Sequence, residues 1–354
     1  MMKKVYFPVL VALLVFAIDK VALIPAFRQC CTTAPSASMY RLSLNSDFRQ
    51  DELIAQARKE NKRIMMTFGS SRSLGYFAGP TIEQIDRSQY ITPAQKQKLK
   101  SWDVINSAAP GASIVTEYVR MIQWLDHGVK PDLLAIEFSR FSLNANSLWH
   151  DEEIKNGIPL DFVLKNIWSM PRAHSATVVG SRVFALSRYR IGAPKAVSAP
   201  MWETLFNQFT DRLTQRAHGS PAGAGVRVGR EEPIALATYN HIASEMNRTM
   251  FQGYRPDADM TKYAFLMAER AKRDGIPIVF WNPAAHPIWN AVEEKADPRD
   301  RFARVVRDLK ASGGIYLDLN RAGVMKCDEF SDPVHSHQNC FPEMAIATIE
   351  AGGL

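Results

Sequence analysis

The sequence predicts an α/β protein in which helices cover both faces of a parallel sheet, with a membrane-spanning helix at the N-terminus. Three observations predict this fold class. Short, continuous apolar runs alternate with amphipathic stretches along most of the chain, as parallel strands alternate with crossover helices. The 354 residues are 46% hydrophobic and 22% charged, a composition typical of globular domains. A long apolar segment follows two lysines near the N-terminus.

The N-terminal segment Val5–Phe27 is long enough to cross a bilayer as one helix. Lys3 and Lys4 precede it and favour a cytoplasmic N-terminus, which places the rest of the chain outside. We therefore expect an uncleaved anchor over residues 1–28. The protein would then be a single-pass protein of the cytoplasmic (inner) membrane with its domain in the periplasm or extracytoplasmic space.

Two charged residues, Asp19 and Lys20, interrupt the apolar segment. We expect them to mark the membrane edge, and the alternative is that they touch another helix. A cleaved signal peptide or a lipoprotein signal is disfavoured, because the residues before Cys30 form a poor processing site. Residues 29–38 read as a small, polar linker, so the folded domain is expected over residues 39–354.

The first half of the domain shows helix and strand patterns in turn. A helix is expected over Asp51–Asn61, with apolar residues on one face, and an apolar strand over Arg63–Phe68. Trp102–Ile105 is a second short apolar run, and a loop follows it. Ser113–His127 has apolar residues at helical spacing, and Asp132–Phe138 is a third strand.

The C-terminal part resumes the same alternation. We expect a helix over Thr261–Arg273, then a Gly-Ile-Pro turn into a strand over Ile278–Trp281. A helix over Arg301–Ala311, a last strand over Gly314–Leu319 and a closing helix over Met344–Glu350 follow.

Between these halves, at about residues 141–260, the alternation blurs. We interpret this stretch as an insertion that forms a lid or substrate platform. Its glycine-rich piece, Ala222–Gly225, lacks a following Gly-Lys-Ser/Thr and is therefore no phosphate loop.

The net charge of +7 comes from 43 basic and 36 acidic residues, without a long run of either sign. This pattern favours a surface that tolerates anionic lipid or envelope polymer, and no motif indicates nucleic-acid binding. We expect neither a metal nor an organic cofactor, and none of the four cysteines has metal-ligand spacing.

Two short motifs carry residue types for acyl transfer. Ser70 and Ser71 follow the first core strand after Gly69, at the strand end where parallel sheets form their sites. Near the C-terminus, Asp332 precedes His335 by three residues, so it can orient the histidine as a base for a serine. An ordinary turn is the structural alternative for each motif, and His337 and Asp318 are rivals for base and acid.

Other residues at this sheet edge are weaker candidates. Gly111 follows the second strand, where its backbone N–H can approach a substrate oxygen. Arg72 could hold an anionic acyl donor or sugar. For Asn282 and His286, after the fourth strand, we expect structural hydrogen bonds.

Four cysteines, Cys30, Cys31, Cys327 and Cys340, fit an exported domain, where disulfides persist. Cys327 and Cys340 bracket the Asp-x-x-His segment, so a disulfide between them would staple that loop. The adjacent Cys30 and Cys31 can hardly pair with each other.

Taken in order, Gly69-Ser70-Ser71, Gly111 and Asp332-x-x-His335 resemble the first, second and fifth sequence blocks of SGNH/GDSL hydrolases. The N-terminal helix and the Gly-Ser-Ser-Arg form are similar to the exported branch with DltD-like, alginate-acetylation-type and DUF1574-like proteins. The resemblance covers residues 63–140 and 275–350 by order and spacing.

This resemblance implies a three-layer α/β/α sandwich with a flavodoxin-like parallel sheet and ester chemistry at a serine. It implies that Ser71 is the nucleophile, His335 the base and Asp332 its orienting acid. Ser71 and Gly111 would donate backbone N–H groups to the oxyanion.

One departure concerns the third block of the family, Gly-x-Asn-Asp, whose asparagine is an oxyanion donor. Here Glu137-Phe138-Ser139-Arg140 follows the third strand, and Asn144 lies further on. Ser139, Arg140 or Asn144 would have to supply the missing polar group.

We therefore expect an extracytoplasmic serine esterase or O-acyltransferase that acts on an acyl ester of a cell-envelope glycan. Its expected partners are the glycan or acyl donor, the membrane and a membrane-bound acyltransferase. The alternative, favoured by the missing asparagine, is a catalytically inactive envelope scaffold or glycan-binding protein.

Overall fold

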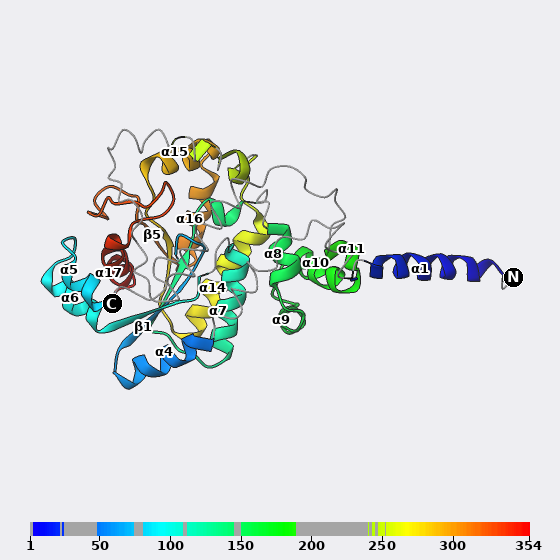
Figure 1. Cartoon of the computed structure of the whole chain (residues 1–354), viewed down its shortest axis with the longest axis horizontal. Coiled ribbons are helices and arrows are strands. Elements are labelled where there is room, and N and C mark those ends of the chain that lie inside the picture. Colours follow the sequence, from blue (N-terminus) through cyan, green and yellow to red (C-terminus); the bar gives the residue numbers. More distant parts are fainter. Residues whose placement is uncertain are drawn as a thin grey trace. The chain divides into compact units, whose positions relative to one another are not determined.

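The computed structural model describes residues 3–21, 23–24, 48–73, 81–108, 112–144, 150–188, 240, 243–244, 247–251 and 253–354 (Figure 1). The chain forms two compact units. One unit comprises Met1–Ser38 and Ile154–Ala222, and the other comprises Met39–Glu153 and Gly223–Leu354. The second unit, which we call the sheet unit, contains every strand of the sheet.

The sheet unit is built on a parallel five-stranded sheet with the order β2-β1-β3-β4-β5. The strands are β1 (Arg63–Phe68), β2 (Trp102–Asn106), β3 (Leu133–Glu137), β4 (Ile278–Asn282) and β5 (Ile315–Asp318). The predicted class, a parallel sheet flanked by helices, is confirmed. All five predicted strands form, with ends that differ by at most one residue from the expected ones.

Continuous apolar runs form these strands because both sheet faces are covered. Every residue of β3 and β4 is buried, and in β1 only Arg63 is exposed. The central pairing sets Phe68 of β1 beside Ile136 of β3, so both strands end at one edge of the sheet.

One sheet face packs against three helices, α5 (Ile82–Arg87), α6 (Pro93–Lys100) and α17 (Phe341–Ala351). Side chains at alternate strand positions, such as Met65 and Trp281, join one core cluster with α17. Of these three helices, only α17 coincides with a helix that the sequence predicts.

The other helices of the sheet unit include α7 (Ile114–Asp126) and α14 (Ala258–Asp274), which run on the side of the sheet away from α17 (Figure 1). Ser113 and Asp257 cap their N-termini by accepting backbone N–H bonds. Three further helices of this unit are α4 (Phe48–Lys59), α15 (Pro287–Ala296) and α16 (Arg301–Ala311). Short helical turns lie at η2 (Phe141–Leu143), η3 (Asn247–Phe251) and η4 (Gln338–Cys340).

The other unit is helical in its described parts. It holds α1 (Lys3–Val21), α9 (Leu160–Asn166), α10 (Arg172–Val183) and α11 (Ala185–Arg188). The helix α8 (His150–Gly157) contains the point at which the chain passes between the units.

Asp19 is buried against α11, where its carboxylate accepts the N–H groups of Ala185 (2.8 Å) and Leu186 (2.7 Å). Lys20 pairs with Asp19 at 2.9 Å and also donates to the Val183 carbonyl. The two charges therefore join α1 to α11, which corresponds to the alternative that they touch another helix and not to the expected membrane edge.

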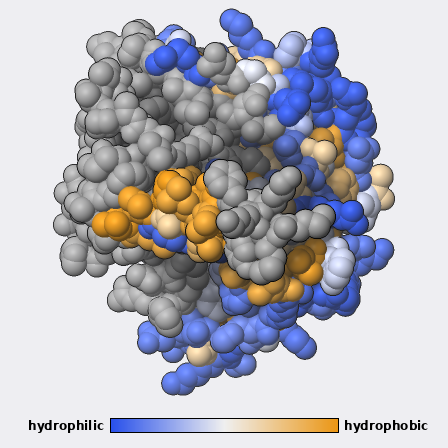
Figure 2. All heavy atoms as spheres, turned by 90° about the vertical axis from the view of Figure 1, so that its right-hand side faces the viewer, coloured by the Kyte–Doolittle hydropathy of each residue, from blue (hydrophilic) through white to orange (hydrophobic). Residues whose placement is uncertain are grey.

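The sequence predicts a membrane-spanning helix over Val5–Phe27, whereas α1 ends at Val21. Among the described helices, none is both long enough and apolar enough to cross a membrane. Apolar side chains are exposed along α1 from Val9 to Val21, and Trp168 after α9 is 94% exposed. Figure 2, viewed from the right-hand side of Figure 1, shows that apolar residues gather in patches on the surface.

Candidate active site

The turn after β1 carries Ser71 and passes very close to β3. A Cβ atom on Gly69 would lie 2.1 Å from Ser73 Oγ and 2.7 Å from the Glu137 carboxylate. No side chain fits at that distance, so glycine is required here by close approach of the neighbouring groups. The Ser71 turn, residues 69–73, is therefore packed directly against the end of β3.

Ser71, His335 and Asp332 form a chain of hydrogen bonds. Ser71 Oγ lies 3.0 Å from His335 Nε2, and His335 Nδ1 lies 2.6 Å from Asp332 Oδ2. With Nδ1–H donated to the carboxylate, Nε2 is left to accept the serine proton. The two motifs, 264 residues apart in the chain, thus meet in the order that nucleophile activation requires.

The Asp332 carboxylate is tied to its own turn. Its Oδ1 accepts the N–H groups of Val334 (2.8 Å) and His335 (3.0 Å). Burial raises the pKa of Asp332, but the charge of His335 and these hydrogen bonds outweigh it, so this pKa lies below its ordinary value. Asp332 is therefore suited to remain an acceptor for His335.

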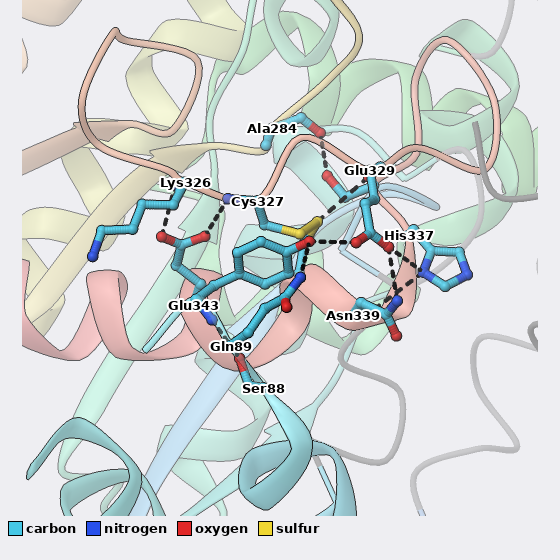
Figure 3. The surroundings of a disulfide bond; sticks show 12 residues. Ser88, Gln89, Ala284, Lys326, Cys327, Glu329, His337, Asn339 and Glu343 are labelled. Carbon is cyan, nitrogen blue, oxygen red and sulfur yellow. Dashed lines mark hydrogen bonds and ion pairs between the residues drawn. A yellow bond between two sulfur atoms is a disulfide. The ribbon is translucent and has the colours of Figure 1, made fainter. Parts of the chain in front are cut away.

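A disulfide closes the loop that carries this pair. Cys327 and Cys340 are bonded, with a sequence separation of 13 residues. Glu343 of α17 accepts the N–H groups of Lys326 (2.8 Å) and Cys327 (2.7 Å), as Figure 3 shows. The start of the base loop, residues 327–340, is thus fixed to the helix that follows its end.

A polar cluster inside the base loop holds the rival base, His337. The buried Glu329 carboxylate accepts from Asn339 (2.7 Å) and from the Tyr90 hydroxyl, and it lies 3.4 Å from His337 Nδ1 (Figure 3). His337 also caps η4 by accepting the N–H of Asn339. The structure therefore sets His335, and not His337, beside Ser71.

The remaining polar groups at the end of β4 and β5 support the loops. Asn282 donates to Asp318 at 3.2 Å, and Asp318 also accepts the Asn320 N–H at 3.0 Å. His286 caps α15 by accepting the Ile288 N–H. These are structural hydrogen bonds, as expected for Asn282 and His286, and they occupy the rival acid Asp318.

The base loop also bonds to the segment after β4. The Pro333 carbonyl accepts the His286 N–H at 3.0 Å, and Ser336 Oγ donates to the Ala284 carbonyl at 2.7 Å. The loop is therefore held on both sides of His335.

Arg72 does not have the exposed position that anion binding would require. It is buried, with Nε 3.1 Å from Glu137 and Nη1 3.5 Å from Glu293. Glu293 in turn accepts the Trp289 indole N–H at 2.8 Å. Both ion pairs of the guanidinium are internal, and the expectation that Arg72 holds a substrate stays a prediction.

Gly111, Ser139 and Asn144 are the residues that we expected at an oxyanion hole. Gly111 lies outside the described residues. Ser139 is fully buried, with its Oγ 3.2 Å from Ser142 Oγ. Asn144 is also fully buried, and its side-chain oxygen accepts the Arg255 N–H at 3.3 Å. The missing third-block donor is therefore not replaced by a solvent-facing Ser139 or Asn144.

Two residues that contact the Ser71 turn were not among the predicted site residues. Glu137, at the end of β3, bonds to Ser70, Arg72 and Ser73. Asn106, at the end of β2, donates to the Ser73 carbonyl at 2.8 Å. A charged or amide side chain at the end of a mostly apolar, buried strand is the signal that could have found both.

Comparison with known proteins places the chain in one family. No curated protein and no solved structure matches it. A family model described as "Protein of unknown function (DUF1574)" matches residues 1–350. Because that match covers nearly the whole chain, the protein belongs to the DUF1574 family.

Proposed function

We propose that the protein is an SGNH-like serine esterase or O-acyltransferase with a three-layer α/β/α, flavodoxin-like fold. The observation that carries the proposal is the contact of Ser71 Oγ with His335 Nε2 at 3.0 Å, continued to Asp332 at 2.6 Å. The strand order, with its all-parallel pairing, supports the flavodoxin-like assignment. Ser71 follows β1 at the carboxyl edge, where such sheets bind ligands.

In the proposed reaction, Ser71 Oγ attacks the ester carbonyl while His335 Nε2 takes the hydroxyl proton. The tetrahedral intermediate collapses, the C–O bond to the leaving alcohol breaks, and His335 returns the proton to that alcohol. The acyl-enzyme on Ser71 then reacts with a sugar hydroxyl or water by the same steps in reverse roles. Asp332 stabilises the imidazolium in both halves.

The oxyanion would be held by the backbone N–H groups of Ser71 and Gly111, as the family resemblance implies. A third donor is missing from the sequence pattern. Loss of one oxyanion donor typically lowers the rate by about 10²–10³-fold, so a two-donor site remains a catalyst of moderate power.

The proposed substrate is an acyl ester of a cell-envelope glycan. In this proposal α1 anchors the protein in the inner membrane, and the folded domain lies on the extracytoplasmic side, where it meets the glycan. The exposed apolar side chains of α1 support membrane association. Leu164, Ile167 and Trp168 add exposed apolar surface at helical spacing beside α9, and tryptophan favours the membrane–water interface. A membrane-bound acyltransferase would be the partner that supplies or receives the acyl group.

The test of the chemistry compares Ser71→Ala with Ser101→Ala in the full-length protein. Ser101 lies at the opposite end of β2, where its Oγ caps α6, so its loss leaves the site intact. With p-nitrophenyl acetate, we expect Ser71→Ala to lower turnover by at least about 10³-fold and Ser101→Ala to leave it unchanged. Equal turnover in the two variants would refute Ser71 as the nucleophile.

The alternative, a catalytically inactive scaffold or glycan-binding protein, is favoured by the burial of Asn144. Labelling with a serine-reactive phosphonate separates the two proposals. An adduct on Ser71 supports the enzyme, and folded protein without an adduct supports the scaffold.

Membrane attachment has its own test. Full-length protein should stay with membranes after an alkaline carbonate wash, and a chain that begins at residue 39 should be released. Release of both proteins from the membranes would refute the membrane anchor, and the proposal that Ser71 is the nucleophile would be unaffected.

A further inference from the structure

We propose that Glu137 is the positioning residue of the nucleophile. Its carboxylate binds the Ser71 turn on both sides of Ser71 and so directs Ser71 Oγ to His335. This inference rests on the proposed function, but Glu137 itself touches neither the substrate nor the reacting atoms.

Both carboxylate oxygens of Glu137 are engaged by the turn. Oε2 accepts the Ser70 N–H at 2.8 Å and the Ser73 hydroxyl at 2.7 Å. Oε1 accepts the Ser70 hydroxyl at 2.8 Å and Arg72 Nε–H at 3.1 Å. The residues before and after Ser71 are thus bound to one group, while Ser71 Oγ faces His335.

Ser70, which is bound to Glu137, also accepts hydrogen bonds from the backbone of the turn. Its Oγ accepts the Arg72 N–H at 3.3 Å, and its carbonyl accepts the Ser73 N–H at 3.1 Å. The turn is therefore closed by hydrogen bonds that start from the carboxylate, and its shape depends on that carboxylate accepting all of them.

The sheet fixes where the carboxylate lies. The register that pairs Phe68 with Ile136 makes Gly69 and Glu137 the next residues on neighbouring parallel strands. The lack of a side chain on Gly69 lets Glu137 approach within a distance at which a Cβ would collide. The position of the turn is thus set by a rigid element and not by the loop itself.

The charge of the group also matters. Glu137 is fully buried, and an isolated buried carboxylate is strongly disfavoured. Arg72 supplies the opposite charge at 3.1 Å, and the three remaining bonds come from neutral donors. A neutral amide in this place would present an N–H₂ group to donors that need an acceptor.

Glu137→Gln therefore keeps the shape of the side chain but forces part of the turn to move. Because displacement of a reacting group by about 1 Å costs on the order of 10²-fold in rate, we expect kcat to fall by about that factor. KM for a small ester should change less than about threefold, since Glu137 does not contact the substrate. Glu137→Asp, which keeps the charge, should recover part of kcat.

The matched control is Glu153→Gln. Glu153 is also a buried glutamate that accepts a backbone N–H, from Ser113 at 2.9 Å, but it is not bonded to the Ser71 turn. Rates are expressed per phosphonate-titratable or folded molecule, so that loss of folded protein does not count as loss of kcat. Equal kcat for the Glu137 and Glu153 variants would overturn the proposal.

A second measurement does not depend on esterase activity. In a Ser71→Cys chain, a thiol near His335 should react quickly with iodoacetamide, because an adjacent imidazole favours the thiolate. The reaction of a chain that keeps Ser71 gives the background from the other cysteines. Adding Glu137→Gln should slow alkylation of Cys at position 71 by at least about tenfold, and adding Glu153→Gln should not.

The two experiments keep the hypotheses separate. If the chain with Ser71 hydrolyses no ester but Glu137→Gln still slows the alkylation, the proposed function fails and the positioning role stands. If ester turnover is present and Glu137→Gln changes neither kcat nor the alkylation rate, the positioning role fails and the proposed function stands.

Discussion

The Ser71 turn and the base loop bring one site together by different physical means. The Ser71 turn is five residues long and is bound to a buried, charged group on the neighbouring strand. The base loop is longer, and a disulfide and the carboxylates of Glu329 and Glu343 hold it at the sheet's edge. A short turn can be fixed by one acceptor, whereas a long loop loses more conformational entropy on ordering and needs several attachments.

The Ser71 turn and the base loop should therefore respond differently when one of their attachments is removed. Loss of an acceptor in the Ser71 turn leaves buried donors unsatisfied, which costs stability and geometry together. Loss of an attachment in the base loop first releases a segment that carries both Asp332 and His335. Variants in the two regions test this contrast.

The largest effect is expected within the base loop, between its two histidines. His335→Ala should lower ester turnover by about 10⁴-fold or more, because no other described group lies at Ser71 Oγ to take its proton. His337→Ala removes a neighbour of Glu329 and a cap of η4, so it should mainly lower the melting temperature. Similar turnover in the two variants would mean that the contact at 3.0 Å is not the catalytic one.

Gly69→Ala tests how tightly the Ser71 turn is packed. The added methyl would collide with Ser73 Oγ and the Glu137 carboxylate, so we expect a loss of stability of about 1–3 kcal/mol or more and a strong fall in turnover. Gly180→Ala in α10 is the control, since its added methyl meets open space and alanine favours helix. Thermal unfolding and ester turnover of both variants measure the contrast, and a fully active Gly69→Ala protein would contradict it.

Removal of the disulfide tests the base loop in the same way. Cys327→Ser with Cys340→Ser should lower the free energy of unfolding by about 3 kcal/mol, the value expected for a loop of this length. Turnover should fall further than the loss of folded protein explains, because the bond closes the loop that carries His335. The variant should still label at Ser71 with phosphonate, though slowly. Turnover equal to that of the unaltered chain would show that the hydrogen bonds alone hold the loop.

Much of the fold could be predicted because burial of whole strands leaves a direct mark in the sequence. The runs at β1, β3 and β4 are apolar except for Thr67 and for the polar residues at their ends, Arg63, Glu137 and Asn282, and every residue of these strands but Arg63 is buried. Helix α6 left no such mark, since only Leu99 of its residues is buried. The start of α6 does carry a local signal, because Thr92 and Gln95 form a capping box, as Thr81 and Gln84 do at α5.

For the candidate site, local spacing in the sequence predicts the contact of Asp332 with His335. It does not predict the buried ion pairs around the Ser71 turn. Asp332 and His335 are three residues apart, so their contact is a local property. The pairing of Arg72 with Glu137 and Glu293 joins residues 65 and 221 positions apart, and no local spacing indicates it. The sequence therefore predicts a substrate ligand at Arg72, because the carboxylates that pair with it come from distant parts of the chain.

The smallest effects concern two carboxyl groups whose pKa values move in opposite directions. Burial, with the nearby charges of Glu137 and Glu153, raises the pKa of Glu117 well above its ordinary 4.5, and its oxygens have no hydrogen-bond partner among the residues that the structure describes. The folded state therefore keeps a proton that the unfolded state releases, and the unaltered chain loses stability as pH rises above 4.5. Glu117→Gln, which stays neutral, should become more stable than the unaltered chain over that range, and the gap should widen with pH.

Asp332→Asn should show the reverse dependence. The ionised Asp332 stabilises the folded state above its ordinary pKa of 3.8, and that contribution disappears as pH falls through the lower, folded-state pKa. The stability deficit of the variant should therefore be constant near neutral pH and shrink in acid, as followed by thermal unfolding from pH 3 to 8. If the stability difference from the unaltered chain changed with pH in the same direction for both variants, the pKa values of Glu117 and Asp332 would not be shifted in opposite directions. Opposite slopes would show that the protein buries a neutral acid near Glu137 and Arg72 while it keeps an ionised acid beside His335.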